Sequence, residues 1–344
     1  STITSPTNIS LIPVVVVFSE DVSGFTRGDL QVAGAEVSNF VGSGSQYSFE
    51  LTPTAVGEIS VNIGPGAASD SDGFTNIGAS QFIMIFDNAP PTDGAIQIAD
   101  NIAYTNTETV TLNLTATGVS EMYITNIAGC ESGGTWEPFA LTKSWTLSEL
   151  NAANLVYIKY RDGGGNTTGC MSDGIIHDNI APTAILAGTL TTPTIYAAYD
   201  VDINNDDGAD SYKYAMVSGD VDCAVATYND VWISHATNVT GNFASVGFWR
   251  LCVIGKDLAG NIQYVGQATS HDWQYDNVEP SVVLATSSSN PTNELTIPVT
   301  VTFSENVTGF VASDVVLSSG GSITNFSGSG SNYSFFIVPV ETQT

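Results

Sequence analysis

The sequence has very few basic residues. Only 7 Lys and Arg stand against 35 Asp and Glu, which gives a formal net charge of −28 at pH 7. A polyanion of this kind is repelled by nucleic acid and by anionic lipid, so both classes of partner are disfavoured. The acidity serves the solubility of a long surface protein, or it is balanced by hard divalent cations, and the two interpretations are compatible.

Histidine and long apolar runs are also scarce. The three His residues, His177, His235 and His271, stand at no spacing typical of a nucleophile or a metal motif, and there is no phosphate-binding loop. The many carboxylates leave a glycosidase-like pair open, but tandem sandwiches rarely enclose a cleft, and we predict that the chain is not an enzyme. The longest apolar run, residues 11–18, is far below the ~20 residues of a spanning helix, so we expect no direct membrane insertion.

Cysteine occurs only four times, with no C-x-x-C spacing and no Cys/His cluster suited to zinc. The domain edges inferred below place each pair inside one domain. This favours two disulfides, Cys130–Cys170 and Cys223–Cys252, and therefore an oxidising compartment. The alternative is four buried free thiols.

What the sequence does contain is an internal repeat. Residues 6–53 and 291–339 are two copies of one unit, in which Pro13–Glu20 (PVVVVFSE) matches Pro298–Glu305 (PVTVTFSE). A duplicated unit is typical of a tandem array.

A second recurring pattern separates the repeats. An aromatic residue or His precedes Asp-Asn, and Pro follows, at residues 86–92, 177–183 and 275–281. The Asp residues of this pattern are 91 and 98 positions apart, close to the length of one β-sandwich domain. We therefore predict four domains, at residues 1–89, 90–181, 182–279 and 280–344.

The two ends of the sequence fall inside repeats. The first domain begins after the point where the fourth already has residues 281–285, and the fourth stops short of the counterpart of Asp87. We expect that the first domain lacks its first strand, that the fourth is a truncated copy, and that the parent protein is longer. The alternative is that neighbouring molecules complete the sheets by strand addition.

Short alternating segments predict strands. Glu108–Ala116 (ETVTLNLTA) and Val299–Phe303 (VTVTF) alternate apolar and polar residues, and no stretch has a convincing helical period. The fold class is therefore all-β.

The first and fourth domains resemble bacterial Ig-like repeats, through Phe18-Ser19-Glu20-x-Val22-x-Gly24-Phe25 and its copy. The second and third are similar to related repeats, through residues 157–166 and 252–261. The resemblance implies tandem immunoglobulin-like β-sandwiches in an elongated array, on the bacterial cell surface or otherwise extracellular. Such repeats form stalks of adhesins and fibres, and many bind calcium at domain junctions.

Topology indicates where junction ligands would lie. In a seven-stranded sandwich the F–G turn lies at the pole where the preceding linker enters, so we expect the turn at 161–166 to meet the first linker. Two carboxylates and an Asn carbonyl there would suit Ca²⁺. The predicted ligands are Asp87, Asp162 and Asn166 at the first junction, and Asp178, Asp257 and Asn261 at the second. The alternative is that Asp-x-x-Gly-Asn is only a good turn sequence. Asp70 and Asp72 occupy the equivalent turn of the first domain, where the Gly-Asn spacing is broken.

The third domain contains a local acidic cluster. Oxygen-bearing side chains alternate before Gly208, as at the start of a calcium loop, although the Gly is one residue late and no Glu closes the loop. The predicted ligands are Asp202, Asn204, Asp206, Asp207 and Asp210. The alternative is a solvated acidic turn.

These features predict a structural or adhesive stalk or fibre segment whose partners are neighbouring copies or domains, stiffened by calcium. A second hypothesis is an adhesin in which one domain binds a glycan or protein receptor, favoured if two exposed Trp line a pocket. A third is a non-catalytic array attached to a secreted enzyme. The ligand-binding residues of these alternatives are unknown from the sequence.

Overall fold

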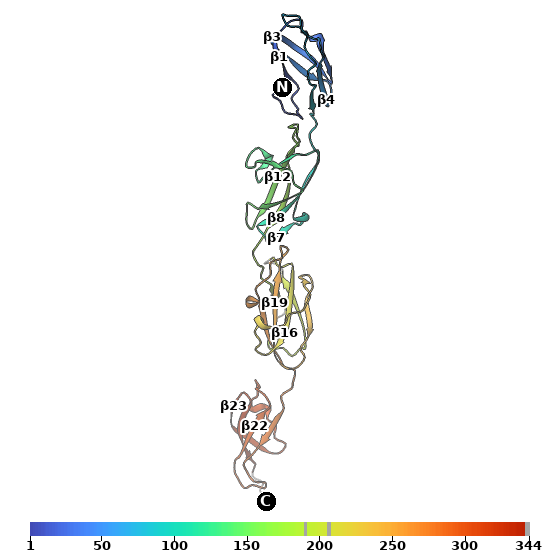
Figure 1. Cartoon of the computed structure of the whole chain (residues 1–344). Helices are drawn as coiled ribbons and strands as arrows, with labels where there is room; N and C mark the ends of the chain where they lie inside the picture. The colour runs from blue at the N-terminus through green and yellow to red at the C-terminus, as the bar shows by residue number, and fades with distance from the viewer. Residues whose placement is uncertain (189–190, 205–207, 341–344) are drawn as a thin grey trace. The chain divides into compact units, whose positions relative to one another are not determined.

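The structure is a computed structural model that describes residues 1–188, 191–204 and 208–340. Strands, turns and short 3-10 helices make up these residues, without an α-helix among them, so the predicted all-β class is confirmed (Figure 1). The chain forms two compact units. The first comprises residues 1–182 with 208–210 and 255–263, and the second comprises the rest of the described chain.

Residues 12–86 form two facing sheets, β1–β3 and β2–β4–β5. The strands are β1 (Ile12–Val22), β2 (Leu30–Ala33), β3 (Ala35–Pro53), β4 (Gly57–Ile63) and β5 (Phe82–Phe86), with the 3-10 helix η1 (Arg27–Asp29). Side chains alternate between the two faces of a strand, so Ile12 and Val14 are buried while Val15 is half exposed. The buried faces of both sheets share one core, which includes Phe49 and Ile59.

Residues 92–177 form a five-stranded sheet, β10–β9–β12–β13–β7, and a three-stranded sheet, β11–β8–β6. The strands are β6 (Thr92–Ile98), β7 (Tyr104–Thr105), β8 (Thr109–Thr117), β9 (Glu121–Thr125), β10 (Trp136–Pro138), β11 (Thr142–Thr146), β12 (Ala153–Arg161) and β13 (Met171–His177), with η2 (Ala99–Asn101) and η3 (Ala128–Cys130). The predicted alternating strand at 108–116 is β8, whose Val110, Leu112 and Leu114 point into the core.

Residues 185–275 form the sheets β14–β15–β18 and β17–β16–β19–β20. The strands are β14 (Ile185–Ala187), β15 (Ala198–Asn204), β16 (Ser211–Ser218), β17 (Ile233–Ser234), β18 (Val239–Asn242), β19 (Gly247–Lys256) and β20 (Thr269–Tyr275), with η4 (Cys223–Val225) and η5 (Val265–Gln267). Val201, Tyr212, Leu251 and Trp273 belong to one buried cluster that both sheets enclose.

Residues 282–339 form one sheet, β21–β22–β24–β23. The elements are β21 (Val282–Ala285), β22 (Ile297–Phe303), β23 (Gly321–Ser329), β24 (Asn332–Pro339) and the 3-10 helix η6 (Ala312–Asp314). In this repeat of the first sandwich, β22 is the counterpart of β1. It pairs with β21 and β24, whereas β1 pairs only with β3 in the part of the chain that the structure describes.

The sequence repeat is also a repeat of packing. The rings of Phe25 and Tyr47 lie 5.0 Å apart in an edge-to-face arrangement, and their counterparts Phe310 and Tyr333 also lie 5.0 Å apart. Each sheet of the described residues takes its strands from one of the four predicted ranges 1–89, 90–181, 182–279 and 280–344. The four-domain division itself stays a prediction.

Candidate functional site at the linkers

Each of the three Asp-Asn segments forms the same local turn. The side-chain Oδ1 of Asp87, Asp178 and Asp276 accepts a hydrogen bond from the backbone N–H two residues later, at 3.0 Å in all three. A short Asp side chain favours this Asx turn because its carboxylate reaches its own following backbone. One oxygen of each linker carboxylate therefore accepts a bond from within its own linker.

Each linker is also fastened to a threonine near the start of its own sandwich. The backbone N–H of Asp87 donates to the carbonyl of Thr7 at 2.9 Å, that of Asp178 to Thr105 at 2.9 Å, and that of Asp276 to Thr194 at 3.0 Å. The residue after each threonine, Asn8, Asn106 or Ile195, therefore stands beside the linker.

Two turns with the pattern Asp-x-x-Gly-Asn adopt one geometry. In residues 162–166 the backbone N–H of Asn166 donates to Asp162 Oδ1 at 2.9 Å, and the side-chain Nδ2 of Asn166 donates to Asp162 Oδ2 at 2.9 Å. In residues 257–261 the corresponding bonds from Asn261 to Asp257 are both 2.8 Å. Gly165 and Gly260 have φ values of 92° and 93°, a conformation that glycine adopts without steric cost.

The turn asparagine also reaches the preceding linker. Asn166 Nδ2 donates to the backbone carbonyl of Asp87 at 2.8 Å, and Asn261 Nδ2 donates to that of Asp178 at 2.8 Å. Both bonds lie within the first compact unit. We call these the first joint, Asp87 with residues 162–166, and the second joint, Asp178 with residues 257–261.

Asn8 completes the first joint. Its backbone N–H donates to the carbonyl of Gly164 at 3.1 Å, and its Nδ2 donates to Asn166 Oδ1 at 3.2 Å. Asn106 lies beside Gly260 in the second joint, as Asn8 lies beside Gly165 in the first. The partnership of Asn8 with the turn was missing from the sequence interpretation, although Thr-Asn recurs at 105–106.

The donor set at these joints differs from a calcium site. Ca²⁺ binds six to eight oxygen ligands, whereas here both carboxylate oxygens of Asp162 accept bonds from the N–H groups of Asn166, and Asp87 Oδ1 accepts from Ala89. No three Asp, Glu, His or Cys side chains converge on a metal-sized site within residues 1–188, 191–204 and 208–340. As arranged, the joint does not present the predicted ligand set, because Asn166 turns its Nδ2 donor rather than its Oδ1 toward Asp87. Calcium at the joints stays a prediction.

The predicted acidic loop is described only in part. Asp202 and Asn204 lie at the end of β15, and the backbone N–H of Asp210 donates to the carbonyl of Lys256 at 2.9 Å. Asp206 and Asp207 lie outside the described residues, so this calcium prediction also stays a prediction.

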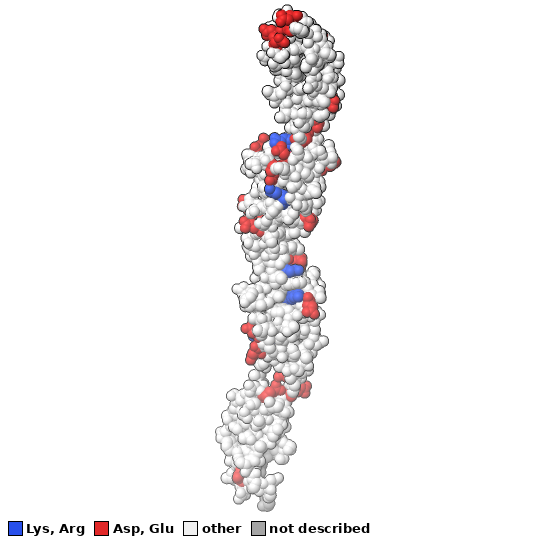
Figure 2. Space-filling model, viewed as in Figure 1, with Lys and Arg blue, Asp and Glu red and all other residues white. Residues whose placement is uncertain are grey.

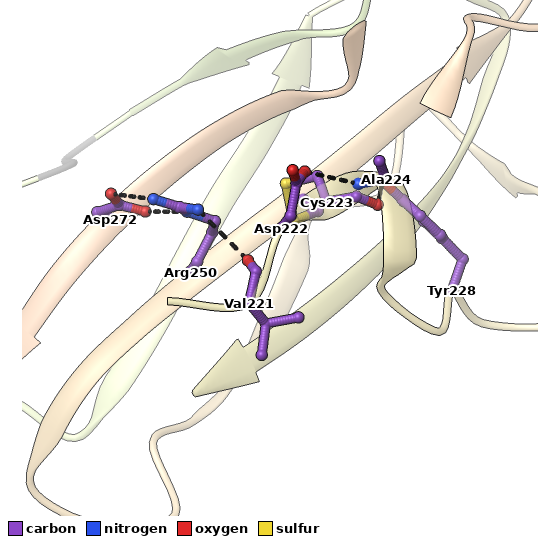
Figure 3. Close-up of a disulfide and its surroundings, with 8 residues drawn as sticks. Val221, Asp222, Cys223, Ala224, Tyr228, Arg250 and Asp272 are labelled. Atoms are coloured by element: carbon purple, nitrogen blue, oxygen red, sulfur yellow. Dashed lines mark hydrogen bonds and ion pairs between the residues drawn. A yellow bond between two sulfur atoms is a disulfide. The ribbon is translucent and has the colours of Figure 1, made fainter. Parts of the chain in front are cut away.

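Both predicted disulfides are present, Cys130–Cys170 and Cys223–Cys252. Figure 3 shows the second, which ties η4 to β19. Asp222 Oδ1 accepts a hydrogen bond from Ala224 N–H at the start of η4, and the Tyr228 hydroxyl donates to the carbonyl of Cys223. Beside it, Arg250 and Asp272 form a two-point ion pair with Nε–Oδ1 at 2.6 Å and Nη2–Oδ2 at 2.9 Å.

Tryptophan forms no exposed pair. Trp136, Trp145, Trp232 and Trp249 are half-buried, and Trp273 is buried. A pocket of about 540 Å³ lies on the third sandwich, and Trp273 contributes to its lining together with Tyr199, Asp200 and Asn238. The predicted mark of a glycan site, two exposed Trp in one pocket, is therefore absent from this pocket.

Charge on the visible face is sparse and mostly negative. Figure 2 shows acidic residues gathered at one tip of the N-terminal sandwich and in smaller groups elsewhere, with few basic residues and a large uncharged area. None of the helices within the described residues has the length and apolar character needed to cross a membrane.

Two segments match a known family. Residues 5–85 and residues 276–343 match the family model of the bacterial Ig-like domain, which confirms the resemblance for these parts. Together they make up less than half of the chain. No curated protein matches the sequence.

Several solved structures of tandem domains match the chain at low similarity. The FN1–FN3 domains of chicken CNTN1 cover 78% of this chain and 96% of their own, at 11% identity and a TM-score of 0.30. Domains A168–A170 of titin cover 79% and 94%, at 8% identity and a TM-score of 0.32. A tetra-tandem repeat in the extending region of a large adhesion protein covers 86% and 82%, at 15% identity and a TM-score of 0.30. Nothing about function follows from likenesses at this level.

Proposed function

We propose that this chain is a stalk or fibre segment of a bacterial repeat protein, at the cell surface or secreted, whose joints limit how adjacent sandwiches move. The family match at both ends supports the bacterial repeat, and the two disulfides support an oxidising, extracellular location. The observation that carries the proposal is the recurrence of one bond, from Asn166 to Asp87 and from Asn261 to Asp178. A spacer needs a contact that recurs at its joints, because the distance between its two ends depends on how stiff each joint is.

The hydrogen bonds of the first joint are strong enough to limit the motion of two adjacent sandwiches. Its bonds are Asn166 to the Asp87 carbonyl and two from Asn8, to Gly164 and to Asn166. A hydrogen bond contributes roughly 0.5–1.5 kcal/mol net, so the three bonds stabilise the closed joint by about 1.5–4.5 kcal/mol. That exceeds thermal energy several-fold, yet it is small beside the stability of a folded domain, so the joint opens under load before a sandwich unfolds.

The proposed joint also indicates which partners the chain binds. Neighbouring sandwiches of the same protein are the partners that this surface fits, and the proposed role is non-catalytic. Calcium remains an alternative way to hold the joint. A calcium-held joint should loosen when a chelator removes the ion, whereas a hydrogen-bonded joint should be unaffected.

The proposal is tested by removing the asparagine side chains. In the full chain, Asn166→Ala with Asn261→Ala should broaden the distribution of interdomain angles in small-angle scattering and electron microscopy. The matched control is Asn88→Ala with Asn179→Ala, since these exposed linker asparagines adjoin Asp87 and Asp178. An unchanged distribution in the first variant would refute the proposal.

A second candidate function is a receptor-binding adhesin. It is favoured by the pocket beside Tyr199, where Asn238 Nδ2 donates to Asp200 Oδ1 at 2.7 Å and the Tyr199 ring stacks on Trp273. An aromatic ring beside polar side chains suits a sugar. A glycan array probed with the full chain tests it, and binding that survives Tyr199→Ala would exclude this pocket.

A further inference from the structure

The first sandwich contains a third copy of the joint turn. In residues 70–74 the backbone N–H of Asp70 donates to the carbonyl of Phe74 at 3.0 Å, and the N–H of Phe74 donates to Asp70 Oδ1 at 2.9 Å. The same two bonds close residues 162–166 and 257–261. Gly73 has a φ of 89°, matching the glycines of the other two turns.

The residue at the fifth position differs in this copy. Phe74 stands where Asn166 and Asn261 stand, so this turn has no amide to offer to a linker carbonyl. Its ring is 75% exposed, and the nearby Ile77 is 88% exposed. The fifth position of the turn, which is polar in two sandwiches, is therefore apolar in the first.

The linker side of the joint has a matching exception. Asn8 and Asn106 follow the threonines that fasten the first two linkers, but Ile195 follows Thr194 in the third sandwich. Ile195 is 68% exposed, and Tyr196 beside it is 72% exposed. Two sandwiches thus have an asparagine beside their outgoing linker, and the third has an apolar pair there.

The order of repeats brings the two exceptions together. The sandwich that carries Ile195 directly precedes residues 280–340, which repeat the sandwich that carries Phe74. In the described joints, Asn8 meets a turn with Asn166. If the residue beside the linker always contacts a turn residue of like polarity, a sandwich with Ile195 should contact a turn with Phe74.

We propose that the Phe74 and Ile77 surface docks the end of a sandwich that carries Ile195 and Tyr196, forming an apolar joint. The occupant is a preceding sandwich with the sequence of residues 183–278. This inference rests on the proposed function, since it extends the same joint to a third kind of pair. The array then alternates two polar joints with one apolar joint, and residues 74 and 195 determine which sandwiches fit together.

The test uses the full chain extended at its N-terminus by its own residues 1–285. Because Pro6 aligns with Pro291, residue 286 is the counterpart of Ser1, and joining residue 285 to Ser1 keeps the natural spacing. So that Ile195 and Phe74 stay in place, Tyr196→Cys in the added copy is combined with Thr75→Cys in the original chain, both at exposed positions, and treated with a short bis-maleimide. Mass spectrometry of the digested protein measures the yield of cross-linked peptide.

Two controls make the outcome unambiguous. Ile9→Cys with Thr167→Cys in the unextended chain reports on the described first joint and leaves Asn8 and Asn166 in place, and Tyr196→Cys with Ile83→Cys reports random encounter with an exposed strand residue. We expect the 196–75 yield to match the 9–167 yield and to exceed the 196–83 yield several-fold. A 196–75 yield equal to the 196–83 yield, with the 9–167 pair cross-linked, overturns this inference alone. Failure of the 9–167 pair overturns the proposed joint and this inference with it.

Discussion

The side-chain Nδ2 of Asn166 lies 2.8 Å from the backbone carbonyl oxygen of Asp87, a residue 79 positions earlier in the chain. The carboxylate of Asp162 accepts a hydrogen bond from the same Asn166 Nδ2, so this donor is oriented even when the linker is not bound to it. The contact therefore has little side-chain entropy left to lose, which is why one amide contributes usefully to a joint.

The backbone amide of Asn8 is a reporter for this joint. It donates to the carbonyl of Gly164, so it exchanges with solvent when the joint opens. Asn166→Ala should raise its hydrogen-exchange rate by about 5-fold to 150-fold, since two joint hydrogen bonds, to the Asp87 carbonyl and from Asn8 Nδ2, are lost at a cost of about 1–3 kcal/mol. The amide of Thr7, which donates to the Ile85 carbonyl, should exchange as before. Equal exchange of Asn8 in both proteins would count against the joint.

The two disulfides should each stabilise their own sandwich. They join residues 40 and 29 positions apart, and the chain-entropy model gives roughly 3–4 kcal/mol for loops of this length. We expect Cys223→Ala with Cys252→Ala to lower the free energy of unfolding of the third sandwich by that amount, and its urea midpoint accordingly. The transition of the second sandwich should be unaffected, and loss of both transitions would show that the sandwiches do not unfold independently.

Acid should weaken the third sandwich through the Arg250–Asp272 pair. The hydrogen bond from Arg250 holds the pKa of Asp272 below its ordinary value of 3.8. A lowered carboxyl pKa stabilises the fold above 3.8, and this contribution is lost as the pH falls through the folded-state pKa. The carboxylate is 59% exposed, so the effect is at most about 1 kcal/mol. Between about pH 5 and 2, the melting temperature of Asp272→Asn should depend less on pH than that of the exposed control Asp230→Asn.

Alkali should weaken the second sandwich through Tyr160. Burial raises the pKa of its phenol to about 12, and the hydroxyl donates to the Ala95 carbonyl at 2.7 Å. A raised phenol pKa gives stability that is present below 10 and is lost as the pH rises toward 12. Tyr160→Phe should cost about 1 kcal/mol at neutral pH and flatten the alkaline decline. Tyr264→Phe, at a phenol that is 69% exposed, is the control and should leave the decline unchanged.

Much of the fold was predictable because it depends on residue type and spacing. Alternation in Glu108–Ala116 predicted β8, and the Asp-Asn spacing placed each cysteine pair inside one predicted domain, as the two disulfides confirm. The topology of a sandwich also predicted that the turn at 161–166 would face the linker of Asp87.

The chemistry of the joint was less predictable, for a physical reason. An asparagine side chain offers both an oxygen and an N–H group, and the sequence does not say which one faces its neighbour. The calcium hypothesis assumed the oxygen, whereas Asn166 presents its Nδ2 to Asp87. The broken Gly-Asn spacing at 70–76 was visible in the sequence, but only the matching hydrogen bonds identify Phe74 as the counterpart of Asn166.

The most direct measurement is the distance distribution across the first joint, by pulsed electron resonance between spin labels at Val41→Cys and Leu141→Cys, both on exposed side chains. It is recorded in EDTA and in calcium, for the otherwise unmodified chain and for Asn166→Asp, which keeps the shape but removes the Nδ2 donor. The account predicts a narrow distribution in EDTA that calcium leaves unchanged, and a broad one for Asn166→Asp in EDTA. A distribution that is broad in EDTA and narrows only when calcium is added would contradict it.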